Sequence, residues 1–225
     1  MTESSTRKLA LSGWLHKTSI TDYGNPLKLQ KFLFFYESLS KVVRDEYDLS
    51  GLRGYRHGPV FSAVWDERND EAESFLDKAS HACQSHPELV NADRAAVGLF
   101  IIQAFTMEEL IRITHSMHIW KAKKAEIEKA LAGSPKAEQG VPLSEQDFSK
   151  HDSSMILRMA SAYTCEFVNS VRVVSVGGTN FAFPVKDAGR LAPEHYDVLY
   201  QLDTGGELEN PVYAYIDEDG AIVVD

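Results

Sequence analysis

Residues 26–43, PLKLQKFLFFYESLSKVV, carry the apolar pattern from which the fold is predicted. Apolar side chains recur there at helical spacing, at Leu29, Phe32, Leu33, Tyr36, Leu39 and Val43. Phe34 and Phe35 widen the stripe around most of the helix, and Pro26 suits a first helical turn. Because a helix that is apolar on nearly all sides must be covered by other elements, we predict that this helix is the buried centre of the protein. Its aromatic residues are then core residues.

The rest of the first two thirds of the chain is also predicted to be helical. A turn signal at residues 22–26 precedes the central helix, and residues 51–59 break the pattern as an extended stretch or short strand. Gly58-Pro59 is predicted to end that stretch and start a helix. Ser144 with Asp147 resembles a further helix start. The predicted helices cover residues 8–19, 26–43, 60–76, 89–105, 107–115, 119–131 and 152–168.

The period of the apolar pattern changes after residue 168. Residues 171–176 and 181–185 are rich in β-forming side chains and flank Gly177-Gly178-Thr179-Asn180, which is a hairpin signal. A short helix over 193–202 and a second hairpin, 212–216 with 221–224, follow. The fold class predicted is therefore mainly α: a multi-helix domain over residues 1–168 and a small α+β extension with two β-hairpins over residues 169–225.

The charge is unevenly distributed along the 225 residues. The net charge is −10, which argues against direct nucleic-acid binding. The one basic cluster, Lys121 to Lys129, is interleaved with Glu126 and Glu128 and is typical of a solvated helix face. Residues 1–150 are nearly neutral, whereas Leu191 to Asp225 contain nine acidic residues and no Lys or Arg. This acidic end is either a solubility feature or a surface for a basic partner.

The sequence indicates a cytoplasmic protein. Its longest apolar run, residues 97–105, is far shorter than the roughly 20 residues of a membrane span. The N-terminal residues MTESSTRKL are polar and do not form a signal peptide. Cys83 and Cys165 have no CxxC spacing, so we expect reduced cysteines.

No local pattern predicts catalysis, a metal site or a cofactor. His115 and His118 could share a helix face, but a zinc site needs further ligands that the sequence does not place beside them. Asp217 to Gly220 is followed by apolar side chains and is read as a turn, not as a calcium loop. Gly177-Gly178 lacks the lysine or third glycine used to cradle phosphate. We therefore expect a protein that is not an enzyme.

Three segments, in this order and spacing, resemble the Panacea domain, the SocA-like antitoxin domain that also occurs in phage-associated proteins. They are PLKLQKFLFFY over residues 26–36, YRHGPVF over residues 55–61, and ELIRITH over residues 109–115 followed by Trp120. The family shows a KLQKLLYF-type helix, a Gly-Pro-Val preceded by Tyr or His, and a Thr-His segment followed by Pro-Trp. Ile119 stands where the family has that proline. The resemblance covers roughly residues 9–155.

The resemblance directs attention to a set of signature residues. Lys28 and Gln30 lie between buried apolar positions, so their polar ends are expected to hold neighbouring loops. Thr114-His115 is expected to end a helix, where histidine can bond free carbonyl groups. Structural support and partner contact both remain open for Arg56, His57, Gly58, Pro59, Thr114, His115 and Trp120. The candidate contacts in the acidic extension are Glu194, Asp197, Glu207 and Glu209.

The resemblance implies an antitoxin that neutralises a cognate protein toxin, encoded by an adjacent gene, through direct binding and without a cofactor. Such systems act in phage defence. The second hypothesis is an adaptor or regulatory module that delivers a client to a protease or binds a phage protein, and the third is an enzyme with an unrecognised site. Homo-oligomerisation is left open, and neither a membrane nor a nucleic acid is an expected partner.

Overall fold

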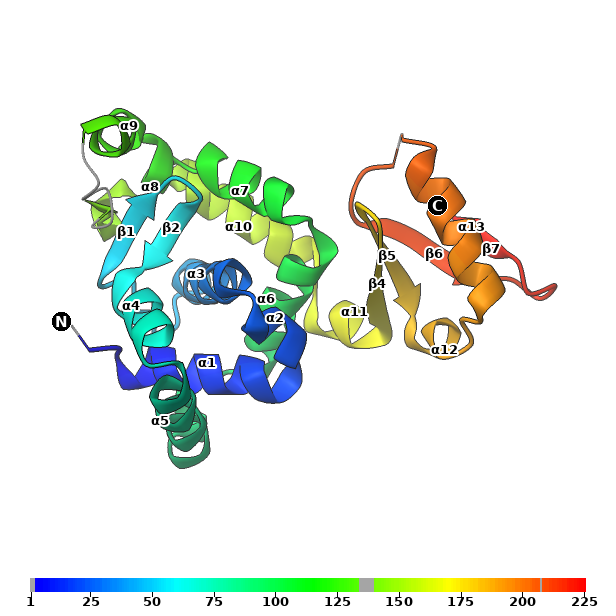
Figure 1. The fold of residues 1–225 in the computed structure, drawn as a ribbon, viewed down its shortest axis with the longest axis horizontal. Helices are drawn as coiled ribbons and strands as arrows, with labels where there is room; N and C mark the ends of the chain where they lie inside the picture. Colours follow the sequence, from blue (N-terminus) through cyan, green and yellow to red (C-terminus); the bar gives the residue numbers. More distant parts are fainter. Residues whose placement is uncertain (1–2, 134–139, 207) are drawn as a thin grey trace.

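The computed structural model describes residues 3–133, 140–206 and 208–225. It shows a helical body with a smaller unit of strands and helices at one end of the long axis (Figure 1). The protein is mainly helical, as predicted. Among the described residues, no helix combines the length and the apolarity needed to cross a membrane.

Helix α3 (Pro26–Val42) lies at the centre of the body, with other elements around it (Figure 1). The Asn25 side chain caps it by accepting hydrogen bonds from the backbone N–H groups of Leu27 and Lys28, at 3.0 and 3.2 Å. Leu33, Phe34 and Phe35 are completely buried. The predicted central helix is confirmed, and it ends within one residue of the predicted position.

Short helices surround α3, and several predicted helices are divided. Two helices stand in place of each of the helices predicted at residues 60–76, 119–131 and 152–168, and the first of these pairs begins only at Ser62. The helices of the body are α1 (Thr6–Thr18), α2 (Ile20–Gly24), α4 (Ser62–Asp70), α5 (Ala72–Ser85), α6 (Ala92–Ala104), α7 (Met107–Ser116), α8 (His118–Lys121), α9 (Lys124–Gly133), α10 (Lys150–Ala162) and α11 (Cys165–Ser170), with single 3-10 turns η1 (Pro87–Leu89) and η3 (Glu145–Asp147).

The side chains at the helix ends explain these divisions. The Thr164 hydroxyl accepts a hydrogen bond from the Phe167 N–H at 3.2 Å and begins α11, which separates it from α10. Ser19 caps α2, a short helix where a turn was predicted. Ser144 and Asp147 form the predicted capping box, but the helix that follows begins only after a second box at Ser149 and Asp152.

The prediction that Gly58-Pro59 starts a helix is wrong. Pro59 lies in β2 (Gly58–Phe61), which pairs antiparallel with β1 (Leu52–Tyr55). The reason is a contact distant in sequence. The Gln30 side chain accepts from the Phe61 N–H at 2.8 Å and donates to the Phe61 carbonyl at 3.4 Å, which keeps Phe61 extended. Helix α4 therefore begins only at Ser62.

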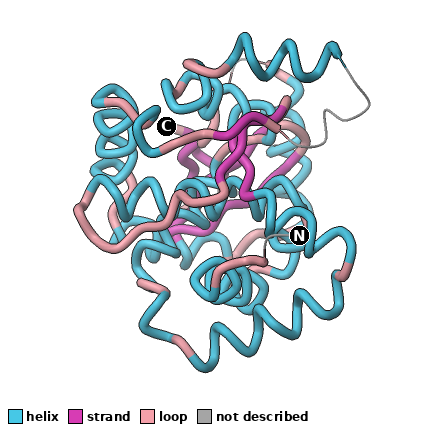
Figure 2. Tube along the Cα trace, turned by 90° about the vertical axis from the view of Figure 1, so that its left-hand side faces the viewer, coloured by secondary structure: helices cyan, strands magenta, loops and turns pink. Residues whose placement is uncertain are grey.

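The sheet of the body has the order β2-β1-β3, in which β3 is Val141–Pro142. Seen from the left-hand side of Figure 1, the strands of the molecule project near the middle of the view, with helices around them (Figure 2). Because β2 is an edge strand, a proline, which has no N–H to donate, is tolerated there.

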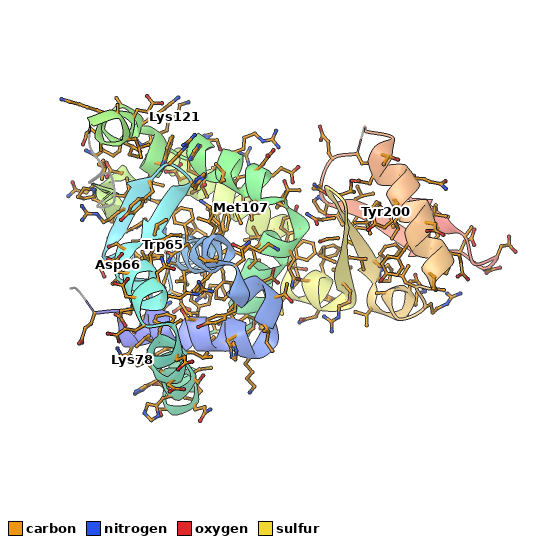
Figure 3. All side chains as sticks on the ribbon, in the orientation of Figure 1. Trp65, Asp66, Lys78, Met107, Lys121 and Tyr200 are labelled. Carbon is orange, nitrogen blue, oxygen red and sulfur yellow. The ribbon has the colours of Figure 1, made fainter. Side chains whose placement is uncertain are left out.

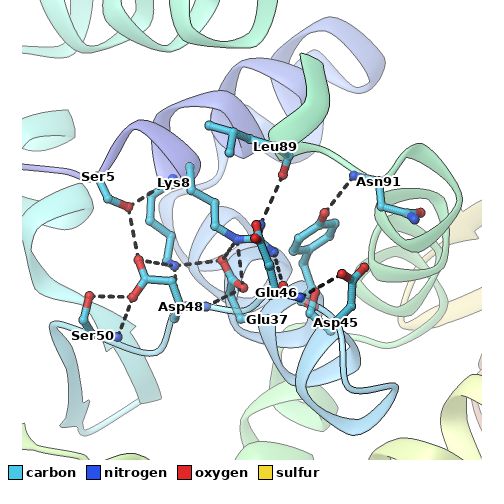
Figure 4. A network of polar contacts seen from close by, with 12 residues as sticks. Ser5, Lys8, Glu37, Asp45, Glu46, Asp48, Ser50, Leu89 and Asn91 are labelled. Carbon is cyan, nitrogen blue, oxygen red and sulfur yellow. Dashed lines mark hydrogen bonds and ion pairs between the residues drawn. The ribbon is translucent and has the colours of Figure 1, made fainter. Parts of the chain in front are cut away.

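A buried carboxylate joins α1, α3 and the loop that follows α3 (Figure 4). Glu37 is fully buried and accepts hydrogen bonds from Arg7 Nε at 2.9 Å, Lys8 Nζ at 2.8 Å and the Asp48 N–H at 2.9 Å. Burial acts to raise the pKa of Asp48, but Lys8 and hydrogen bonds from Ser50 outweigh it and hold that pKa at about 2. The Glu37 carboxylate can be buried because Arg7, Lys8 and the Asp48 N–H all donate hydrogen bonds to it.

The extension forms a four-stranded sheet with the order β4-β5-β6-β7. Both predicted hairpins are confirmed, and the predicted helix over 193–202 is α13. A parallel pairing of β5 with β6 joins the two hairpins and was not predicted. The elements are β4 (Val171–Val176), β5 (Thr179–Pro184), α12 (Val185–Ala188), α13 (Pro193–Thr204), β6 (Val212–Ile216) and β7 (Ile222–Val224).

The extension has its own hydrophobic cluster but is also fixed to the body. Leu199 of α13 is buried in a cluster with Phe181, Phe183 and the inward side chains of β6. Two asparagine side chains reach the body: Asn180 Nδ2 donates to the Ala104 carbonyl at 3.3 Å, and Asn210 Nδ2 donates to Glu109 at 3.0 Å. These bonds give the extension a defined position against α6 and α7.

The central position of α3 predicts a large effect of truncating Leu33. Leu33→Ala leaves a cavity in the centre of the body and should lower the free energy of unfolding by about 2–5 kcal/mol in urea denaturation. The matched control is Leu157→Ala on α10, where the side chain is 44% exposed, and it should change that free energy by less than about 0.5 kcal/mol. Equal effects of the two substitutions would contradict the placement of Leu33.

Candidate functional site

The Arg56–His57 turn between β1 and β2 presents two polar side chains to solvent. Tyr55 pairs with Gly58, so the turn has only two residues, and both are exposed. Gly58 has a φ of +103°, which favours glycine. A Cβ at Gly58 would clash with Lys31 Nζ and would lie 2.7 Å from Thr114 Oγ1. The sharp turn therefore requires glycine for two independent reasons.

The backbone of this turn is held from inside the body by two side chains. Trp120 Nε1 donates to the Tyr55 carbonyl at 3.0 Å, and Lys31 Nζ donates to the His57 carbonyl at 2.5 Å. Thr114 and His115 of α7 contact these two side chains, Thr114 by a hydrogen bond from Lys31 and His115 by stacking on Trp120. The donors come from α3 and α8, so the structure brings the three signature segments together at one turn.

Lys31 is the buried centre of this arrangement. The residue is 1% exposed, and its amine also donates to Thr114 Oγ1 at 3.0 Å. Thr114 in turn donates to the Leu110 carbonyl at 2.9 Å. Burial lowers the pKa of Lys31 to about 7. The sequence prediction named Thr114 as a candidate but did not single out Lys31, although a lysine inside an otherwise apolar helical stripe was a usable signal.

The His115 ring packs as an uncharged aromatic group against Trp120. Its ring stacks on Trp120 with 3.7 Å between centroids and 12° between planes. Burial, helped by nearby Lys31, lowers the pKa of His115 to about 4. The expectation that this histidine bonds the free carbonyl groups at its own helix end is wrong, because its ring is turned towards Trp120 and the Arg56 backbone. Its Nε2 atom is buried without a hydrogen-bond partner among the described residues.

Lys28 and Gln30 hold neighbouring segments, as predicted from the sequence. Lys28 Nζ forms an ion pair with Asp22 at 2.7 Å, and Gln30 binds the Phe61 backbone as described above. Asp22 also accepts from Gln103 Nε2 at 2.7 Å, which connects α2 to α6. These two candidates therefore support the structure around α3.

A pocket of about 220 Å³ lies beside the Arg56–His57 turn. Its walls are mostly apolar and come from α3, α4, α9 and the β1–β2 hairpin. Figure 3 labels Trp65, one of its lining residues, next to Asp66 on α4. Burial and the nearby Asp66 raise the pKa of Tyr55. The lining residues are Leu27, Tyr55, Arg56, His57, Val60, Trp65 and Leu131.

The acidic candidates lie in the extension, at the other end of the long axis from β1 and β2 (Figure 1). Glu194 and Asp197 are exposed on α13, and Glu209 is exposed in the segment after it. Glu207 lies outside the described residues. Two tyrosines that the sequence prediction missed, Tyr196 and Tyr200, are 39% and 56% exposed on α13 (Tyr200 is labelled in Figure 3). Their spacing of four residues places them on one helix face.

The histidines and cysteines do not gather. His118 Nδ1 lies 3.1 Å from the Asp147 carbonyl, and its backbone N–H donates to Asp152, so it is separate from the ring contacts of His115. Across residues 3–133, 140–206 and 208–225, no group of three or more His, Cys, Asp or Glu could hold a metal ion. Cys83 and Cys165 are both free.

Comparison with known proteins gives no relative. No protein-family model matches the chain, and neither a curated protein nor a solved structure matches it.

The buried amine of Lys31 predicts a specific pH dependence of stability. The pKa of Lys31 is about 7 in the folded protein and 10.5 in the unfolded chain. At pH values between these two, the unfolded chain therefore binds more protons than the folded protein. The free energy of unfolding of the parent should therefore rise with pH, relative to Lys31→Met, by up to about 1.4 kcal/mol per pH unit in that window. Urea denaturation at several pH values between about 7 and 10 measures this difference.

The control for this experiment is Lys17→Met, at an exposed lysine on α1. Its stability difference from the parent should not change with pH. A difference between the parent and Lys31→Met that stays constant over the same range would show that the Lys31 amine is not desolvated.

Proposed function

We propose that this protein is an antitoxin that neutralises a cognate protein toxin by binding it directly. The resemblance of the three signature segments to the SocA-like family implies this function. The observation that supports it most is the surface of the extension, where carboxylates and tyrosines are exposed on one helix and no lysine or arginine follows Arg190 in the sequence.

The charge of this surface favours a basic partner. Glu194, Asp197 and Glu209 are exposed, and no lysine or arginine follows Arg190 in the sequence. Like charges on one surface repel each other, and a basic protein would relieve that repulsion on binding. Complementary charge also steers diffusional encounter, so this surface suits rapid capture of a toxin.

The tyrosines favour a partner that carries arginine. Exposed Tyr196 and Tyr200 provide aromatic faces beside Asp197. Arginine stacks on such faces and pairs with carboxylates at the same time. Tyrosine is also among the residues that contribute most to protein–protein binding. A toxin that acts on nucleic acids or nucleotides would provide a basic surface of this kind.

The helical body serves as the scaffold for this surface in our proposal. Asn180 and Asn210 bond the extension to α6 and α7, and the ring of Phe167 on α11 lies 5.9 Å from that of Tyr213 on β6. A surface held in this way loses little conformational entropy when it binds.

The proposal is tested first by co-expression. The product of the adjacent gene should stop growth when expressed alone, and this protein should restore growth and co-purify with it. A harmless neighbour, or rescue without a complex, would contradict the antitoxin proposal. A complex that restores growth only in cells with an intact protease would indicate the adaptor function instead.

Charge substitution then tests the surface. In the triple variant Glu194→Lys, Asp197→Lys and Glu209→Lys, the association rate with the toxin should fall by at least about tenfold at low salt. Raising the salt concentration should weaken binding by the parent, because the steering charges are screened. Stopped-flow or biosensor kinetics at low and high salt measure both effects.

The matched control places the same change of charge on the helical body. The control variant replaces three exposed carboxylates at or near the start of α5, which lies far from the extension in Figure 1. The substitutions are Glu71→Lys, Glu73→Lys and Asp77→Lys. This variant should bind the toxin at nearly the parental rate. If the extension variant associates with the toxin at the parental rate, and binding by the parent does not depend on salt, the carboxylates do not bind the toxin and serve solubility instead.

A further inference from the structure

The pocket beside the Arg56–His57 turn is a second surface of different chemistry. The Arg56 guanidinium has no hydrogen-bond or ion-pair partner among the described residues, and Arg56 and His57 are both exposed. The backbone carbonyls of the turn, by contrast, face donors inside the body. Because Trp120 and Lys31 hold the carbonyls of Tyr55 and His57, the turn cannot rotate freely, and its two side chains remain at the pocket.

The interior of the pocket is apolar. Leu27 of α3, Val60 of β2, Trp65 of α4 and Leu131 of α9 converge on it from four elements. Its volume of about 220 Å³ is below the roughly 300–1,000 Å³ typical of small-molecule sites. A space of this size fits one large side chain, and a pocket filled by a single anchor residue is typical of protein–protein binding sites.

We propose that this pocket binds an aromatic or branched aliphatic side chain of a protein partner, in a segment where a carboxylate stands beside that side chain. The apolar walls receive the anchor side chain. Arg56 offers a planar donor pair that matches a carboxylate, and the His57 ring adds a further donor. The partner segment is therefore acidic and apolar, the reverse of the basic surface expected to meet the extension.

The pocket can bind such a segment whether or not the extension binds a toxin. The pocket lies in the helical body, away from α13, and its test uses peptides and no toxin. Failure of the peptide experiment would leave the toxin-binding experiment unaffected, and the reverse also holds.

The probe is the blocked peptide acetyl-Gly-Ser-Phe-Asp-Ser-Gly-amide, titrated into the full protein labelled with nitrogen-15. We expect saturable shifts of the amide resonances of Leu27, Val60 and Leu131 and of the Trp65 indole. Replacing the peptide's Asp by Asn should weaken binding by about tenfold, the value of one charged hydrogen bond. Replacing its Phe by Ser should abolish the shifts.

Protein variants assign the charge recognition to the turn. Arg56→Gln should bind the Asp and Asn peptides equally, whereas Arg158→Gln, an exposed arginine on α10, should retain the parental preference for Asp. Equal binding of the two peptides by the parent, or shifts that do not involve the pocket residues, would overturn the proposal. Tighter binding of free acetyl-phenylalanine than of the peptide would contradict the proposal that the pocket binds a protein segment, and would indicate a small-molecule site instead.

Discussion

The Lys31 amine lies inside the helical body, between the His57 carbonyl at 2.5 Å and the Thr114 hydroxyl at 3.0 Å. An amine removed from water destabilises the fold unless it has hydrogen-bond partners in good geometry. Its position therefore constrains the residues around it: Gly58 must lack a side chain, and Thr114 must face inward from α7. The three signature segments are related because each contributes to the surroundings of one buried group.

This constraint has a consequence at the surface. The side chains that hold the turn from inside leave Arg56 and His57 outside, next to an apolar pocket. The extension presents carboxylates and tyrosines at the other end of the molecule (Figure 1). A protein with an arginine turn beside an apolar pocket at one end and exposed carboxylates at the other can engage two segments of a partner at the same time, and such double engagement raises affinity without a larger single interface.

Local sequence patterns predicted the parts of the fold that depend on local interactions. The apolar stripe of α3 and the two hairpins of the extension were predicted because period and turn residues determine them. Pro59 was misplaced because Gln30, far away in the sequence, keeps Phe61 extended. The pairing of β5 with β6 was missed for the same reason, since no turn signal connects them. At the candidate site, the family resemblance directed attention to Arg56, His57 and Thr114, but only the structure shows that Lys31 joins the segments.

We propose that this protein acts by forming a complex and not by chemical turnover. The decisive measurement is a titration of a fixed amount of the purified toxin with the protein, while toxin activity is recorded. We predict a linear loss of activity that ends at a fixed molar ratio, with the toxin recovered unmodified and active after the complex is denatured and the toxin refolded. Complete inactivation by a small fraction of that amount, with lasting inactivation of the recovered toxin, would contradict the claim.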